Sequence, residues 1–142
     1  MARPPKPYRL ITHTADLGME VRGKDLTDLF VQAGWAFFDV MMEARRIDLQ
    51  QERTITVEAP DREALLIAWL GELLYLFETQ HLVFGKFLIQ AITSQSLQAC
   101  GWGELFDLKK HHLKSTIKAV TYHQLRIWEE KGGWRARVIF DL

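Results

Sequence analysis

The chain has 142 residues, of which 48% are hydrophobic and 25% are charged, and its 18 Lys and Arg are balanced by 18 Asp and Glu. This length suits one domain with its own hydrophobic core. The zero net charge argues against a general nucleic-acid-binding protein, which usually carries a basic excess, but it leaves a local basic patch open. A single cysteine, Cys100, excludes a disulfide framework or a cysteine-rich zinc site within the chain.

The first seven residues hold three of the four prolines and predict an extended, mobile arm, followed by one domain over residues 8–142. The start lacks the apolar run of a signal peptide, and no stretch approaches the ~20 apolar residues of a membrane-spanning helix. We therefore expect a cytoplasmic protein.

Alternating patterns over residues 8–13 and 17–22 predict two paired strands, joined by a short turn that carries Asp16. A helical stripe then runs from Leu26 to Met41, with Asp25 as its N-cap. Residues 52–58 alternate as a strand, and Asp61 caps a second helix. We expect Gly71, inside this helix, to let another element approach closely, because glycine costs about 1 kcal/mol against alanine there.

The second half predicts strands over residues 83–93, 96–102, 116–128 and 134–140, with a hairpin turn at residues 130–133. In the long strand we expect the odd-numbered residues from Ile117 to Ile127 to face one way. Two helices among about seven strands predict an α+β fold, a mostly antiparallel sheet with both helices packed on one face.

The sequence has no phosphate-binding glycine loop, nucleophile elbow or His-Glu-x-x-His zinc helix. What stands out is an acid near each end of the chain, Asp16 in a turn and Asp141 beside the main-chain carboxylate of Leu142. If their strands are neighbours, these groups repel one another, and a hard cation such as Ca²⁺ or Mg²⁺ relieves the repulsion. The simpler alternative, a solvated terminal Asp and a turn Asp that bonds its own backbone, stays open at this point.

Histidines and lysines are the other candidates. His13 lies next to the turn, where it would support a metal ligand. We expect His111 and His112 to be exposed loop residues, His123 to pack against the sheet, and Lys118 to point to solvent or to a carboxylate.

Four blocks resemble the archease family. "HTADLGMEVRG" is similar to its opening, and "LLIAWLGELLYLFET" is similar to its second helix. "GELFDLKKHHLKSTIKAVTYHQL" resembles the block that ends in KAVTYH, and "WRARVIFDL" resembles the ending. The blocks occur in order and cover nearly the whole chain.

The resemblance implies an accessory protein rather than an enzyme. Archease proteins assist the tRNA-splicing RNA ligase, which joins 2′,3′-cyclic-phosphate or 3′-phosphate ends to a 5′-hydroxyl, by promoting its guanylylation and multiple turnover. The family's metal-binding acids match Asp16 and Asp141, with Leu142 as the third contributor and calcium, or a similar ion such as Mg²⁺ or Mn²⁺, as the ligand. His13, His111, Lys118 and His123 are then expected beside the metal or facing the ligase.

Two alternatives differ in class. A stand-alone metal-dependent phosphohydrolase would use Asp16 and Asp141 as ligands and His111 or His123 as base. An RNA-binding or chaperone module would instead use the lysines at positions 109, 110, 114 and 118.

Overall fold

A computed structural model describes residues 5–12 and 16–142 of the chain. The elements follow in the order β1 (Tyr8–Thr12), β2 (Asp16–Gly23), α1 (Leu26–Met41), the short 3-10 helix η1 (Ala44–Arg46), β3 (Gln51–Glu58), α2 (Arg62–Gln80), β4 (Leu82–Ile92), β5 (Ser96–Leu105), α3 (Leu108–His111), β6 (Ala119–Glu130) and β7 (Gly133–Asp141).

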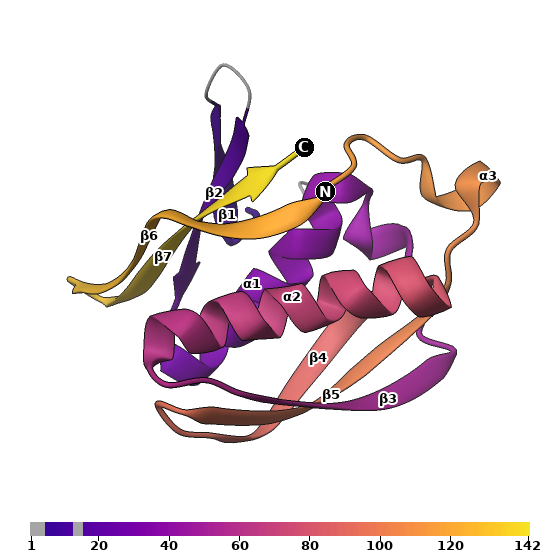
Figure 1. The fold of residues 1–142 in the computed structure, drawn as a ribbon. Coiled ribbons are helices and arrows are strands. Elements are labelled where there is room, and N and C mark those ends of the chain that lie inside the picture. Colours follow the sequence, from indigo (N-terminus) through magenta and orange to yellow (C-terminus); the bar gives the residue numbers. More distant parts are fainter. Residues whose placement is uncertain (1–4, 13–15) are drawn as a thin grey trace.

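The strands form two antiparallel sheets with the long helices between them (Figure 1). Sheet A has the strand order β1-β2-β7-β6, and sheet B has the order β3-β5-β4. Helix α1 contacts both β2 and β4, and α2 contacts both β6 and β3, so each sheet has helices on one face only. The predicted α+β class is confirmed, with the strands divided between two sheets.

Both long helices begin where the caps were predicted. The Asp25 side chain accepts a hydrogen bond from the Asp28 N–H, and the Asp61 side chain accepts one from the Ala64 N–H. Such caps satisfy backbone donors that the first helical turn leaves free. Trp69 of α2 is fully buried and donates its indole N–H to the Phe30 carbonyl of α1, which ties the two helices together.

Side chains of the long strand β6 do not alternate regularly between the two faces of the sheet along its whole length. Its pairing with β7 slips between Thr121 and Arg126, so several residues of β6 oppose a shorter stretch of β7. Gln124, inside this bulge, has a left-handed φ of 53°. The prediction that odd positions share a face is therefore wrong, because the bulge moves Ile127 to the face opposite that of Thr121.

Two glycines have opposite surroundings. A Cβ at Gly71 would meet nothing within 4 Å, so the expectation that another element packs closely there is wrong. A Cβ at Gly103 would instead overlap the backbone carbonyl of Val83 on the neighbouring strand, which explains the glycine in β5.

The chain before β1 is attached to the domain at its described residues. Lys6 forms an ion pair of 2.8 Å with Asp39, whose carboxylate also accepts bonds from the Tyr8 hydroxyl and the Ala44 N–H. Burial alone would raise the pKa of Asp39, but the bonds from Lys6, Tyr8 and Ala44 outweigh it and hold the pKa below its ordinary value. Across residues 5–12 and 16–142, no helix is long and apolar enough to cross a membrane.

Candidate metal-binding edge and the network behind it

The two acids from opposite ends of the chain meet in sheet A. Asp16 begins β2, Asp141 ends β7, and the antiparallel register places them directly opposite each other. Cβ atoms of directly opposed residues lie about 4.5–5.5 Å apart. We call Asp16, Asp141 and the adjoining Leu142 the carboxylate edge.

Alternation along β2 and β7 decides which way these acids point. Residues of both strands that face the helices are apolar, and successive side chains of a strand point to opposite faces. The acids occupy the other phase and lie on the sheet face away from the helices, where Asp141 is exposed and Asp16 is partly exposed. The helix-facing partners are Leu17, Met19 and Val21 of β2 with Phe140, Val138 and Ala136 of β7.

Lys118, the residue before β6, lies at the same edge. Ala119 lies opposite Asp141, and the Lys118 N–H donates a 2.8 Å hydrogen bond to the Asp141 carbonyl. The Lys118 side chain is exposed, as predicted. The backbone of Asp141 is therefore held from both sides, while its side chain is exposed.

The donor set of this edge consists of oxygen atoms. Within the described ranges, no three His, Cys, Asp or Glu side chains cluster as a metal site, so the edge offers two carboxylates and main-chain oxygen. Oxygen donors of this kind fit a hard ion such as Ca²⁺ or Mg²⁺, with water or a partner completing the coordination. His13, predicted beside this site, lies outside the described residues.

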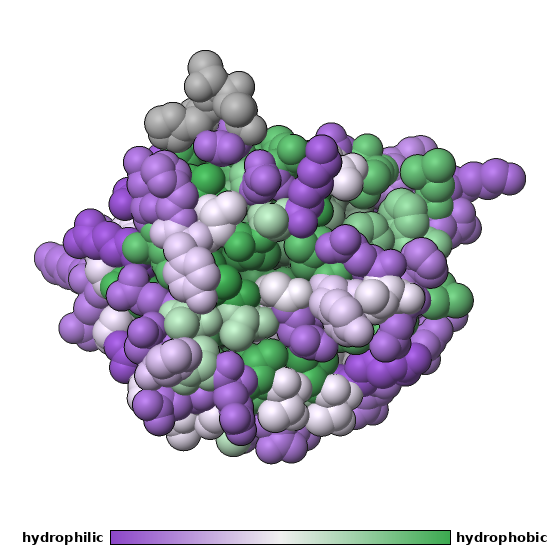
Figure 2. Space-filling view, in the orientation of Figure 1, coloured by the Kyte–Doolittle hydropathy of each residue, from purple (hydrophilic) through white to green (hydrophobic). Residues whose placement is uncertain are grey.

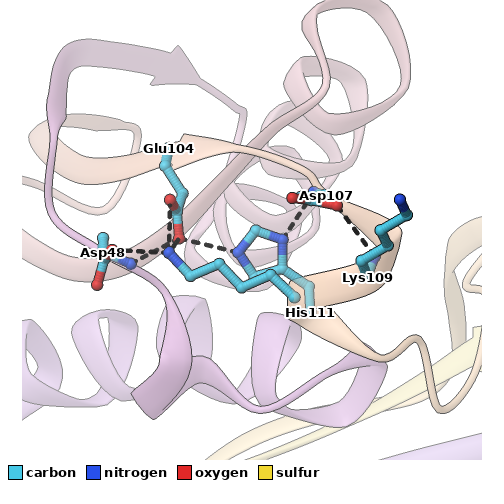
Figure 3. A network of polar contacts seen from close by, with 6 residues as sticks. Asp48, Glu104, Asp107, Lys109 and His111 are labelled. Carbon is cyan, nitrogen blue, oxygen red and sulfur yellow. Dashed lines mark hydrogen bonds and ion pairs between the residues drawn. The ribbon is translucent and has the colours of Figure 1, made fainter.

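His111 belongs to a different, buried cluster (Figure 3). It is 1% exposed, so the expectation of an exposed loop residue is wrong for His111, although His112 is exposed. Its Nδ1 accepts the Asp107 N–H at 2.8 Å, and its Nε2 lies 2.9 Å from Glu104. Because Nδ1 is an acceptor, the Nε2–H donates to Glu104, which fixes the neutral tautomer.

Glu104 is the centre of this cluster. It accepts hydrogen bonds from the Asp48 N–H at 2.7 Å, from Lys110 at 2.9 Å and from His111. Burial alone would raise the pKa of Glu104, but the bonds from Lys110, the Asp48 N–H and His111 keep it below its ordinary value. Lys110 also pairs with Asp48 at 2.7 Å. The cluster thus joins β5, α3 and the chain before β3.

The segment after this cluster leads to the carboxylate edge. Lys114 and Ser115 donate their N–H groups to the Met41 carbonyl at the end of α1. Lys118 then bonds Asp141, so the segment is attached at both ends and in the middle. The cluster at Glu104 therefore fixes the path by which β6 reaches the edge.

The positions of the histidines and lysines bear on the two alternative functions, a metal-dependent phosphohydrolase and an RNA-binding or chaperone module. Both ring nitrogens of His111 are occupied and its side chain is buried, so it is not available as the base of a hydrolase. His123, the other predicted base, is exposed on the β6 bulge, so the expectation that it packs against the sheet is wrong. Among the predicted RNA-binding lysines, Lys110 is committed to Glu104 and Asp48.

Comparisons with known proteins identify the family. Residues 8–142 match the model of the Archease protein family. The chain is 37% identical to protein archease of Methanosarcina mazei, covering 96% of this chain and 97% of that protein, and 39% identical to protein archease of Methanosarcina barkeri with the same coverage.

Solved structures agree with this result. A solution structure of a Methanobacterium thermoautotrophicum protein is similar with a TM-score of 0.83 and 33% identity, covering 97% of this chain and 100% of that one. The crystal structure of an archease from Thermotoga maritima, described as a possible chaperone, shares the fold with a TM-score of 0.63 and 21% identity, covering 100% and 98%. The chain belongs to the archease family.

Proposed function

We propose that the protein is a metal-binding accessory factor of a tRNA-splicing RNA ligase, and that it promotes guanylylation and multiple turnover of that ligase without catalysing a reaction itself. The observation that supports this most strongly is the direct opposition of Asp16 and Asp141 at the end of sheet A. Membership of the archease family supports the choice of partner.

The direct opposition of two carboxylates, Asp16 and Asp141, requires a physical explanation. Like charges directly opposite each other on neighbouring strands are destabilising. A divalent cation between them turns this repulsion into attraction, and calcium tolerates the irregular set of oxygen ligands that two carboxylates and a main-chain oxygen of Leu142 provide. Calcium is the ion we favour, with Mg²⁺ or Mn²⁺ as substitutes.

The position of the edge supports a role on a partner protein. A ligase that accepts a guanine nucleotide must bind phosphates and metal ions in one crowded site. The carboxylate edge lies at the end of two strands, with Lys118 beside it, so a partner can approach it without unfolding the sheet. We propose that the edge positions an ion at the ligase, or favours the ligase conformation that accepts the nucleotide.

A single-turnover guanylylation assay of the ligase tests this role. The wild-type protein should increase the rate, and Asp16→Asn or Asp141→Asn should abolish the increase while the far-UV circular dichroism stays unchanged. Asp48→Asn is the matched control, because it removes an exposed carboxylate that lies before β3, outside sheet A. Normal stimulation by both edge variants would contradict the proposal.

A further inference from the structure

The face of sheet A that points away from the helices carries five arginines. They are contributed by all four strands, and we call them the arginine face: Arg9 of β1, Arg22 of β2, Arg126 of β6, and Arg135 and Arg137 of β7. No helix packs on this side of the sheet in the described part of the chain (Figure 1). Hydrophilic residues cover the left side of the molecule in Figure 2, where Figure 1 shows β2 and the tip of the β6–β7 hairpin.

The strand register arranges these residues in rows across the sheet. One row runs Arg9, Glu20, Arg137, Arg126 from one edge strand to the other. The next row towards the hairpin contains Arg22, Arg135 and Trp128. Arginines that are scattered in the sequence are therefore gathered on one surface, in which Glu20 is the acidic residue of the first row.

Acidic residues compensate only part of this charge. Glu20 pairs with Arg9 at 3.1 Å, and Glu130 pairs with Arg135 at 2.9 Å. Asp16 and Asp141 of the carboxylate edge lie at the other end of the same sheet face. Away from that edge, the face holds five arginines against two glutamates, an excess of three positive charges in a chain whose total charge is zero. Positive charge therefore gathers towards the β6–β7 hairpin, and negative charge gathers at the carboxylate edge.

The remaining three arginines have no carboxylate partner among the residues that the structure describes. Arg22 donates to the Lys6 carbonyl at 2.8 Å, and Arg137 donates to the Gln124 carbonyl at 3.0 Å. Arg126 lies over the ring of Trp128, 4.7 Å from its centroid. These contacts orient the guanidinium groups and leave their charge uncompensated.

We propose that the arginine face binds single-stranded RNA. Guanidinium groups recognise phosphate through paired hydrogen bonds, and an aromatic residue on a sheet surface allows a base to stack. The choice of RNA as the polyanion rests on the proposed function, since a splicing ligase acts on RNA ends. An acidic protein surface would use the charges but not the aromatic ring of Trp128.

The position of this face relative to the carboxylate edge gives the binding a direction. Glu20 and Arg137 lie four residues from Asp16 and Asp141 along their strands, which corresponds to about 13 Å at about 3.3 Å per residue. An RNA strand held by the arginine rows can therefore extend to the carboxylate edge. The face would guide an RNA end towards the place where the ligase meets the protein.

Fluorescence anisotropy tests the inference with purified protein, no ligase, and a labelled single-stranded RNA of about ten nucleotides. We expect a dissociation constant of roughly 1–100 µM at low salt, and a slope of about −2 in log affinity against log salt if three phosphates are contacted. Arg22→Gln with Arg126→Gln should weaken binding by about tenfold or more and flatten the slope to about −0.7.

The matched control removes the same charge from the other sheet. Lys86→Gln with Arg53→Gln acts on sheet B, where Lys86 lies over Trp102 at 5.3 Å, and should leave RNA affinity within about twofold of wild type. Both double variants should keep the far-UV circular dichroism spectrum of wild type, which shows that they fold. Equal weakening by the two double variants would overturn the assignment to this face.

Two further outcomes would also overturn the inference. One is the absence of saturable RNA binding at low salt. The other is binding of polyglutamate as tightly as RNA of the same charge, which would indicate an acidic protein as the occupant. The ligase role is tested separately, because Asp16→Asn should lose the stimulation of ligase guanylylation and keep RNA binding.

Discussion

Replacing Glu104 with glutamine tests whether the buried cluster holds the segment that leads to the carboxylate edge. The change keeps the shape of the side chain and removes its charge. Glu104 is 8% exposed, and its Oε2 accepts both the Asp48 N–H at 2.7 Å and the His111 Nε2–H at 2.9 Å. A glutamine oxygen in the same place keeps both bonds but makes them neutral.

The expected loss follows from these two bonds. Hydrogen bonds to charged groups contribute about 1.5–3 kcal/mol, and neutral bonds contribute about 0.5–1.5 kcal/mol. The difference of about 1 kcal/mol for each bond predicts a decrease of about 2 kcal/mol in the free energy of unfolding. The lost attraction for Lys110 adds to this decrease. At a few degrees per kcal/mol for a chain of this size, the melting temperature should fall by roughly 6–10 °C.

Urea denaturation followed by circular dichroism measures the loss, with Asp48→Asn as the control. Asp48 is paired with Lys110 but is 61% exposed, and its backbone N–H, which bonds Glu104, is unaffected. An exposed ion pair is worth ~0–1 kcal/mol, so this variant should stay close to wild type. A stability of Glu104→Gln within about 0.5 kcal/mol of wild type, or an equal loss in both variants, would refute the reasoning.

Three further predictions concern stability. Gly71→Ala should raise the free energy of unfolding by about 0.5–1 kcal/mol, because nothing lies within 4 Å of the added Cβ and alanine favours the helix; destabilisation in urea would contradict this. Gly103→Ala should cost ~3 kcal/mol or more, because its Cβ overlaps the Val83 carbonyl, and a melting temperature equal to wild type would show that the strands separate easily. Asp39 and Glu104 have a pKa below the ordinary carboxyl value, so their stabilisation is present above that ordinary value and is lost as the pH falls through the lowered folded values. The urea midpoint should therefore fall between neutral and acidic pH, and the fall should be smaller in Glu104→Gln; identical pH profiles would count against this role of Glu104.

Local patterns predicted the long helices, most of the strands and the alternation of the strands next to Asp16 and Asp141. The helix stripes and their caps at Asp25 and Asp61 depend on neighbouring residues, which a sequence displays directly. The placement of Asp16 and Asp141 on one face follows from the alternation of their strands with the apolar residues beside them. Only the pairing of the two strands had to be assumed.

Features that depend on distant contacts could not be predicted. His111 lies in a polar stretch, and nothing local indicates that Glu104 and Phe106 bury it. The β6 bulge contains no glycine, and Gln124 adopts its left-handed conformation because the surrounding sheet requires it. The arginine face arises from the register of four strands, which no local pattern specifies.

The division of the strands into two sheets also lies beyond the sequence pattern. Helix α1 buries more than one side, because Phe37 packs on Phe140 of sheet A while Phe38 packs on Phe84 of sheet B. Helix α2 likewise contacts β6 of sheet A and β3 of sheet B. A single apolar stripe in the sequence predicts which face of a helix packs against one sheet. It does not indicate that a second sheet covers the other face of the same helix.

Calcium titration of the purified protein by isothermal calorimetry tests the account most directly, because the carboxylate edge is its centre. Wild-type protein should bind Ca²⁺ saturably, and both Asp16→Asn and Asp141→Asn should lose this binding while Asp48→Asn keeps it. Calcium binding that is unchanged in both edge variants would contradict the account, since the ion would then be held elsewhere in the chain.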